Sequence, residues 1–284
     1  MSTYKIAVIG GDRRQGVLAA LYAQEGHEVA VYALDGVDTG AATRSADLKG
    51  ALSGAAAVIL PLPASRDGVH VNTQAAAKVP LAYIESMSED GALIIGGMVK
   101  AEHFPAHRVR DYYAAEDLKL YNTLPTAEGA LAIAMNELPT TVHGTKTLIM
   151  GFGRVGKSLG LLLKGFGAEL WVVTRNPTER AVCEILNISC MGYDELPEKI
   201  GEFGLIFNTV PMIILKGELL ERIGDGVPVI DLATYPGGAD AEAAKAMGKK
   251  LIWALALPGK VAPVSAGIYI KKAVDGILKE EGLR

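Results

Sequence analysis

A glycine-rich turn in the second half of the chain has the residue types and the spacing to bind a dinucleotide. Gly151-Phe152-Gly153-Arg154-Val155-Gly156 follows the pattern G-x-G-x-x-G, between a predicted strand at 147–150 and a predicted helix at 154–166. The first glycine permits the tight bend, the second lets the backbone approach a pyrophosphate, and the third allows close helix–strand packing. The free N–H groups of the helix N-terminus attract the phosphates. This context favours a nucleotide site over the alternative, a glycine-rich turn without a ligand.

The end of the next predicted strand indicates which nicotinamide dinucleotide binds. Thr174, Arg175 and Asn176 stand there, where NAD enzymes carry an acidic residue for the ribose 2′-hydroxyl. A guanidinium suits a 2′-phosphate, and the absence of a carboxylate removes a source of repulsion. We therefore expect NADP, with hydrogen bonds from Thr174 and Asn176, and keep NAD as the alternative. It is also open that Arg175 is only a solvated turn residue.

Two further strand ends of this half are expected at the same edge of the sheet, because ligands of open α/β sheets bind outside the carboxyl ends of the strands. Thr209, Val210 and Pro211 follow one strand, and Asp231 and Leu232 end the next. We expect these residues to line the nicotinamide and its ribose. For Asp231, capping of the following helix is an equally good interpretation.

The first half of the chain has a similar turn, at residues 10–16, which lacks the dinucleotide spacing. Depending on which glycine is counted first, Asp12 or Arg13 occupies the position of the central glycine. A side chain there holds the backbone away from a pyrophosphate, and an aspartate repels it, so we expect no dinucleotide here. Arg14, at the start of the following helix, instead suits a carboxylate of the substrate. The alternative is a salt-bridged surface arginine.

Ser65 and Glu128 join Arg14 as candidate catalytic residues. Ser65 follows a predicted strand of the first half and is expected to contact the substrate. Glu128 lies on the predicted helix between the halves. It is either a general base or a carboxylate that only complements the helix dipole.

The histidines do not supply an obvious acid or base. None follows His143, whereas two-domain 2-hydroxyacid dehydrogenases carry a catalytic histidine near the C-terminus. His103 and His107 have the i, i+4 spacing of metal ligands, but Pro105 between them disfavours the helix that would align them. We therefore expect no metal site.

The elements that must position these residues alternate along the chain. Apolar runs typical of buried parallel strands lie at 5–9, 27–33, 57–60, 92–95, 118–121, 147–150, 170–173, 188–191, 205–208, 229–232 and 251–254. Helical stretches between them predict βαβ units. The expected fold is therefore α/β, with two doubly wound parallel-sheet, Rossmann-like domains joined by a bridging helix at 125–138.

The predicted domains differ in role. Residues 1–124 are expected to form a flavodoxin- or Rossmann-like substrate domain, and residues 125–262 the NADP-binding Rossmann domain. We expect the C-terminal helix, 263–284, to pack back on the first domain. The substrate is expected in a cleft between the two domains.

Composition excludes several classes of protein. The 284 residues are 50% hydrophobic and 21% charged, which is not the composition of a disordered chain. The net charge of −4 provides no basic surface for nucleic acid. The longest apolar stretch, 51–64, is too short and too interrupted to span a bilayer. With no predicted signal peptide and only two cysteines, we expect a cytoplasmic protein without disulfides.

The sequence resembles the A subunits of dipicolinate synthases, enzymes of bacterial sporulation, over nearly its whole length. The resemblance is carried by residues 9–15, 121–129, 143–144, 151–156, 208–211, 231–238 and 257–263. It implies oxidation of a dihydrodipicolinate-type ring from the lysine pathway to pyridine-2,6-dicarboxylate, with hydride transfer to NADP⁺. It also implies a small dicarboxylate substrate, a flavoprotein-like B subunit as partner, and the mother cell of a sporulating bacterium. A homo-oligomer is expected.

Two other functions stay open. One is an NAD(P)-dependent dehydrogenase for another small amino or hydroxy acid, which the missing histidine disfavours. The other is a non-catalytic, NADPH-binding regulatory subunit whose partner performs the chemistry.

Overall fold

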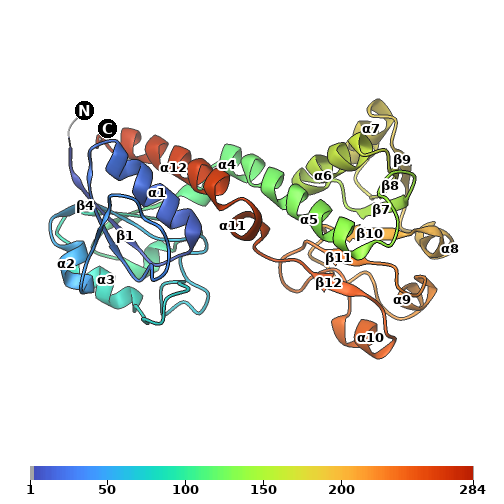
Figure 1. Ribbon diagram of the computed structural model, residues 1–284, viewed down its shortest axis with the longest axis horizontal. Coiled ribbons are helices and arrows are strands. Elements are labelled where there is room, and N and C mark those ends of the chain that lie inside the picture. Colours follow the sequence, from blue (N-terminus) through green and yellow to red (C-terminus); the bar gives the residue numbers. More distant parts are fainter. Residues whose placement is uncertain (1–2, 284) are drawn as a thin grey trace. The chain divides into compact units, whose positions relative to one another are not determined.

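The chain folds into two compact units, and the computed structural model describes residues 3–283 of it (Figure 1). Unit 1 contains the residues up to Asn122 and those from Ala262 on, and unit 2 is Thr123–Val261. These boundaries differ by one or two residues from the expected ones. Within the described residues, no helix is both long enough and apolar enough to cross a membrane.

Unit 1 is a six-stranded parallel sheet with helices on both faces. The strand order is β3-β2-β1-β4-β5-β6, with β1 Lys5–Ile9, β2 Glu28–Tyr32, β3 Thr43–Arg44, β4 Ala55–Ile59, β5 Leu93–Gly96 and β6 Arg108–Asp111. One face packs against α1 Arg13–Gln24, α4 Glu116–Tyr121 and α12 Pro263–Glu280. The other face packs against α2 Leu48–Leu52 and α3 Leu81–Met87. Because both faces are covered, the inner strands are apolar apart from Lys5 and Glu28 at the starts of β1 and β2.

The C-terminal helix belongs to unit 1, where α12 packs alongside α1. Gly267 permits this close approach, since a Cβ atom there would lie 2.8 Å from the carbonyl oxygen of Arg14 and from Cβ of Val17. At its other end, Glu281 follows α12 and accepts a hydrogen bond from Arg108 of β6 at 2.7 Å.

The expected strand at 118–121 is wrong, because these residues belong to the helix α4. Glu116 and Asp117 in its first turn favour a helix start. The apolar residues then recur at helical spacing, with Leu118 buried and Tyr121 stacked on Tyr269 of α12. The sixth strand is instead β6, whose charged residues gave no apolar signal. An edge strand can carry them because one side of it faces solvent.

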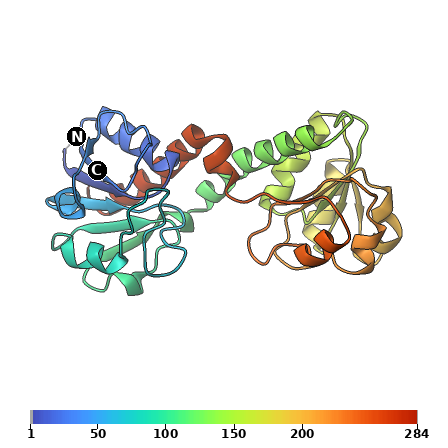
Figure 2. The same cartoon turned by 60° about the horizontal axis from the view of Figure 1, so that its bottom comes forward.

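Unit 2 repeats the same architecture (Figure 2). Its strand order is β12-β11-β10-β7-β8-β9, with β7 Lys146–Met150, β8 Glu169–Val173, β9 Ser189–Met191, β10 Leu205–Asn208, β11 Val229–Asp231 and β12 Leu251–Trp253. One face packs against α5 Thr123–Glu137, α6 Arg154–Gly165, α7 Pro177–Ile185 and α11 Leu257–Val261. The other packs against α8 Leu196–Lys199, α9 Glu218–Arg222 and α10 Ala241–Ala246.

Both sheets have the strand order 3-2-1-4-5-6 of the doubly wound dinucleotide-binding fold. The strand order reverses between β1 and β4 in unit 1, and between β7 and β10 in unit 2. Loops that leave neighbouring strands in opposite directions open a crevice at these two positions. The predicted fold class, two Rossmann-like α/β domains, is confirmed.

Candidate functional site

Unit 2 contains a cavity of about 870 Å³ at the carboxyl ends of β7, β8, β9 and β10. This volume falls in the range of small-molecule and cofactor sites. Eight of the fourteen predicted cofactor-binding residues line the cavity, namely Gly151, Gly153, Thr174, Arg175, Asn176, Thr209, Val210 and Pro211. The structure therefore brings the ends of three predicted strands to one site.

The glycine-rich turn shows which glycines serve packing and which one leaves space. Gly151 has φ +81°, and a Cβ atom there would lie 2.6 Å from Cγ2 of Val210. At Gly156 a Cβ atom would lie 2.5 Å from the carbonyl oxygen of Gly151, so α6 can pack closely on the turn. At Gly153, the N-cap residue of α6, a Cβ atom would have no neighbour within 4 Å. The turn thus leaves open the space that a pyrophosphate needs, and these residues fit a bound dinucleotide.

Two arginines of the cavity have guanidinium groups without a hydrogen-bonded or ion-paired partner among the described residues. Arg175 follows β8 and Arg180 lies on α7; both are exposed and line the cavity. Neither guanidinium makes a hydrogen bond or ion pair within residues 3–283. Asn176, which follows Arg175, accepts a hydrogen bond from the Thr178 N–H at 2.9 Å and so caps α7. An unpaired guanidinium next to a cavity suits an anionic ligand group.

A carboxylate also lines the cavity, although none stands at the end of β8 itself. Glu179, in the first turn of α7, accepts hydrogen bonds from Thr174 Oγ1 at 2.5 Å and from the Phe152 N–H at 3.0 Å. Glu179 was not predicted because it lies on the helix, several residues beyond the end of the strand. An acidic residue in the first turn of a helix was the available signal.

The six other predicted cofactor-binding residues do not line the cavity: Phe152, Arg154, Val155, Gly156, Asp231 and Leu232. The Phe152 side chain is fully buried in the core beneath α6. Phe152 reaches the site only through its backbone N–H, by way of Glu179.

Asp231 is buried and has a structural role at the end of β11. Its carboxylate accepts hydrogen bonds from Asn208 Nδ2 at 2.8 Å, from the Ala233 N–H at 3.0 Å and from the Gly238 N–H at 2.6 Å. These bonds fix the loop after β11 against β10. The helix that follows, α10, is capped by Asp240 instead.

Eight cavity residues were absent from the predicted set: Pro177, Glu179, Arg180, Gly192, Tyr193, Asp194, Met212 and Ile214. Gly192, Tyr193 and Asp194 follow β9, which pairs with β8. The rule that ligands bind at carboxyl ends of strands would have found these three if β9 had been included.

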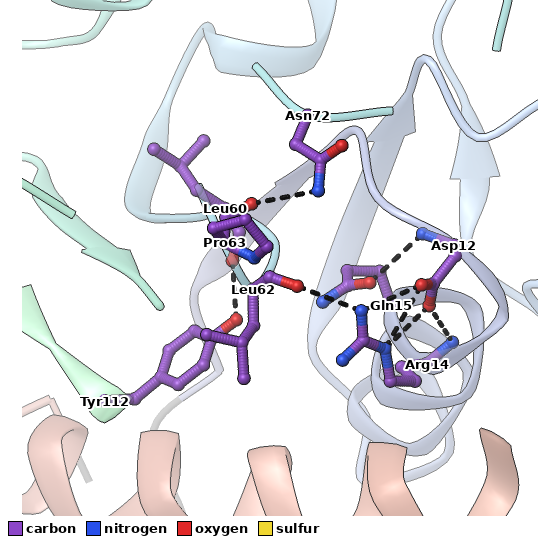
Figure 3. Close-up of polar contacts among 8 residues, drawn as sticks. All are labelled: Asp12, Arg14, Gln15, Leu60, Leu62, Pro63, Asn72 and Tyr112. Atoms are coloured by element: carbon purple, nitrogen blue, oxygen red, sulfur yellow. Dashed lines mark hydrogen bonds and ion pairs between the residues drawn. The ribbon is translucent and has the colours of Figure 1, made fainter. Parts of the chain in front are cut away.

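The turn at residues 10–16 of unit 1 corresponds to the glycine-rich turn of unit 2, but side chains of the turn itself fill the space next to it (Figure 3). Asp12 is the N-cap of α1, as Gly153 is of α6, and its carboxylate accepts the Arg14 N–H at 3.0 Å. Gln15 completes a capping box by accepting the Asp12 N–H at 3.1 Å. A negative charge thus stands where a dinucleotide would place its pyrophosphate.

Arg14 is buried and its guanidinium is held inside the fold. It donates to Asp12 through Nε at 2.9 Å and Nη2 at 2.8 Å, and to the carbonyl oxygen of Leu62 at 3.0 Å (Figure 3). Burial acts to raise the pKa of Asp12, but the hydrogen bonds and charge of Arg14 outweigh it, so the pKa lies below its ordinary value. The pair ties the start of α1 to the loop after β4.

We expect Arg14→Met to destabilise unit 1 by about 3 kcal/mol, because it leaves the Asp12 carboxylate without its counter-charge. Urea unfolding followed by circular dichroism measures this change. The matched control is Arg13→Met, since Arg13 is exposed and makes no ion pair within residues 3–283. Equal stabilities of the two variants would show that the Arg14–Asp12 pair has no structural role.

The other candidate catalytic residues lie in different surroundings. Ser65 donates to Asp67 Oδ1 at 3.1 Å and accepts the Gly68 N–H at 3.0 Å, so its hydroxyl stabilises a loop turn. Glu128 is exposed on α5, and its side chain makes no hydrogen bond or ion pair in the described part of the chain. As the sixth residue of α5 it lies beyond the first turn, where a carboxylate would complement the dipole.

No metal site is found in the described residues. Among residues 3–283, no three or more His, Cys, Asp or Glu side chains are grouped so that they could hold a metal ion. His103 ends the short helix Ala101–His103, and the His107 ring lies 3.0 Å from the carbonyl oxygen of Glu85.

Comparison with known proteins agrees with the resemblance seen in the sequence. Residues 5–120 match the family of N-terminal domains of the dipicolinate synthase A subunit. The A subunit of dipicolinate synthase from Bacillus subtilis (strain 168) is 28% identical over 286 residues, which cover 97% of this chain and 96% of that protein.

Solved structures share the fold. The A subunit of dipicolinate synthase from Bacillus halodurans superposes with a TM-score of 0.88 at 23% identity, over 98% of this chain and 99% of that chain. An L-alanine dehydrogenase superposes with a TM-score of 0.68 at 15% identity, over 98% and 91% of the two chains. The chain is therefore similar to the dipicolinate synthase A subunits along nearly its whole length, it shares the dehydrogenase fold, and its residues 5–120 match the N-terminal domain of that family.

Proposed function

We propose that this protein is the NADP-binding subunit of a dipicolinate synthase, which oxidises a dihydrodipicolinate-type ring to pyridine-2,6-dicarboxylate. The ring loses a hydride to NADP⁺ and a proton to a base, and it becomes aromatic. The observation that carries the proposal is the cavity of unit 2, where an open glycine turn and two unpaired arginines lie together, within residues 3–283.

Different residues of unit 2 bind different parts of the cofactor. The N–H groups at the start of α6 bind the pyrophosphate next to Gly153. Arg175 and Arg180 bind the 2′-phosphate. Residues 209–211, at the end of β10, lie on the other side of the strand-order reversal and line the nicotinamide half. When bound, NADP⁺ supplies the hydride acceptor.

Unit 1 is the proposed substrate-binding unit. Arg13, which is exposed at the start of α1, provides positive charge for a dicarboxylate, whereas the buried guanidinium of Arg14 is paired with Asp12. A flavoprotein-like B subunit is the proposed partner, and homo-oligomers of the protein are proposed to act in the cytoplasm of the mother cell during sporulation.

Mixing the protein with NADP⁺, the B subunit and freshly prepared dihydrodipicolinate tests this function. We expect NADPH and pyridine-2,6-dicarboxylate to appear together, in equal amounts, by absorbance. Formation of the pyridine without NADPH would reject the dehydrogenase assignment and leave the non-catalytic, NADPH-binding role.

In the same assay, Glu128→Gln is expected to lower turnover about 100-fold, the usual contribution of a general base. The affinity for NADP⁺ and the melting temperature should stay unchanged, because Glu128 is exposed and makes no contact with another charged group among residues 3–283. Unchanged turnover would exclude Glu128 as the proton acceptor.

A further inference from the structure

We propose that Glu179 binds the adenosine ribose of the dinucleotide and opposes Arg175 and Arg180 in the choice between NAD and NADP. The proposal rests on the dinucleotide binding proposed above. It assigns the acidic role to a residue of α7, whereas the usual position is the end of β8, where this chain has Arg175.

The carboxylate of Glu179 is fixed in place by donors from two elements. Oε2 accepts from the backbone of the glycine-rich turn, through the Phe152 N–H, and from the end of β8, through Thr174 Oγ1. Thr174 Oγ1 in turn accepts the Asn176 N–H at 3.1 Å. Oε1 makes no hydrogen bond within the described residues and belongs to a side chain that lines the cavity. One oxygen therefore positions the group and the other stays free for a ligand.

The surroundings of this oxygen match a sugar next to a phosphate. Phe152, whose N–H contacts Glu179, directly precedes Gly153, where the turn is open to a pyrophosphate. The group attached to that phosphate on the β8 side is the adenosine ribose in this fold. Its vicinal hydroxyls are donors, and a carboxylate oxygen accepts from them strongly because the hydrogen bond is charge-assisted.

The charges of the cavity act in opposite directions on the two cofactors. Glu179 accepts from both ribose hydroxyls of NAD⁺, but NADP⁺ retains only the 3′-hydroxyl and carries a phosphate that the carboxylate repels. Arg175 and Arg180 attract this phosphate, which NAD⁺ lacks. Removing the charge of Glu179 should therefore weaken the binding of NAD⁺ more than the binding of NADP⁺.

Calorimetric titration of wild type, Glu179→Gln and Glu184→Gln tests this inference. Glu184 lies on the same helix, is exposed and does not line the cavity, so it controls for the loss of one negative charge. We expect Glu179→Gln to weaken NAD⁺ binding about tenfold and NADP⁺ binding less than about threefold. Glu184→Gln should bind both like wild type. Equal effects of Glu179→Gln on the two cofactors, or none, would overturn the proposal.

A ligand lacking one hydroxyl separates ribose binding from mere support of the turn. In the wild-type protein, NAD⁺ with a 2′-deoxyadenosine is expected to bind about tenfold more weakly than NAD⁺. In Glu179→Gln, the two ligands are expected to bind with equal affinity. Equal losses in both proteins would mean that Glu179 does not touch the hydroxyl. If wild type binds neither NAD⁺ nor NADP⁺, the proposed function itself fails.

Discussion

Gly153→Asp is expected to weaken NADP⁺ binding at least about 100-fold while unit 2 stays folded. Gly153 has φ −70°, which any residue adopts, and a Cβ atom there has no neighbour within 4 Å. The new carboxylate projects into the space for the pyrophosphate and takes the N–H groups that would bind it. Aspartate is also a favoured N-cap residue, so the melting temperature should be unchanged or slightly raised.

Unit 1 already contains this arrangement, because Asp12 is the N-cap of α1 and bonds to the Arg14 N–H. The substitution therefore copies the turn of unit 1 into unit 2. Calorimetry with NADP⁺ and a thermal melt measure the two effects separately. Wild-type affinity in Gly153→Asp would contradict the placement of the pyrophosphate.

Two glycines of the same helix serve as controls. Gly165→Asp adds the same charge where a Cβ atom also meets nothing within 4 Å, and it should retain NADP⁺ binding. Gly156→Ala should instead lower the stability of unit 2, because its Cβ atom would lie 2.5 Å from the carbonyl oxygen of Gly151.

Replacement of the two cavity arginines is expected to remove the preference for NADP. Arg175→Ala and Arg180→Ala should each weaken NADP⁺ binding about tenfold, and the double variant about 100-fold, because each removes charge-assisted hydrogen bonds to the 2′-phosphate. Binding of NAD⁺ should change less than about twofold. Stability should not change, since neither guanidinium is paired within residues 3–283.

The ratio of the dissociation constants for NAD⁺ and NADP⁺ is the measurement that decides this prediction. Lys245→Ala is the control, because Lys245 is exposed on α10 and does not line the cavity. A ratio that stays constant in the double variant would show that the arginines do not contact the 2′-phosphate.

Features that depend on short stretches of sequence were predictable. The glycine-rich turn works through six consecutive residues between a strand and a helix, and its three glycines have the predicted roles of bending, opening and packing. The inner strands are buried on both faces and are therefore apolar runs in the sequence. The edge strand β6 and the helix α4 escaped this rule, because an exposed edge need not be apolar and a short apolar run does not distinguish strand from helix.

The composition of the candidate site was predictable only in part. Residues at the ends of β7, β8 and β10 were found because parallel strands bring their carboxyl ends together. Glu179 and Arg180 were missed because they approach the cavity from a helix, through side chains whose direction the sequence pattern does not specify.

By itself, the sequence determined that the protein has two Rossmann-like domains and that only the turn at 151–156 has the spacing for a dinucleotide, since strand burial and glycine spacing are local properties. The tertiary structure decided which polar groups remain free for a ligand. The charge of Arg14 is neutralised by Asp12, and its guanidinium also donates to a carbonyl 48 residues away, whereas the guanidinium groups of Arg175 and Arg180 are unpaired within residues 3–283. A charged side chain is available to a ligand only if no other group of the folded chain neutralises it. Its partners come from different parts of the sequence, and only the fold brings them together.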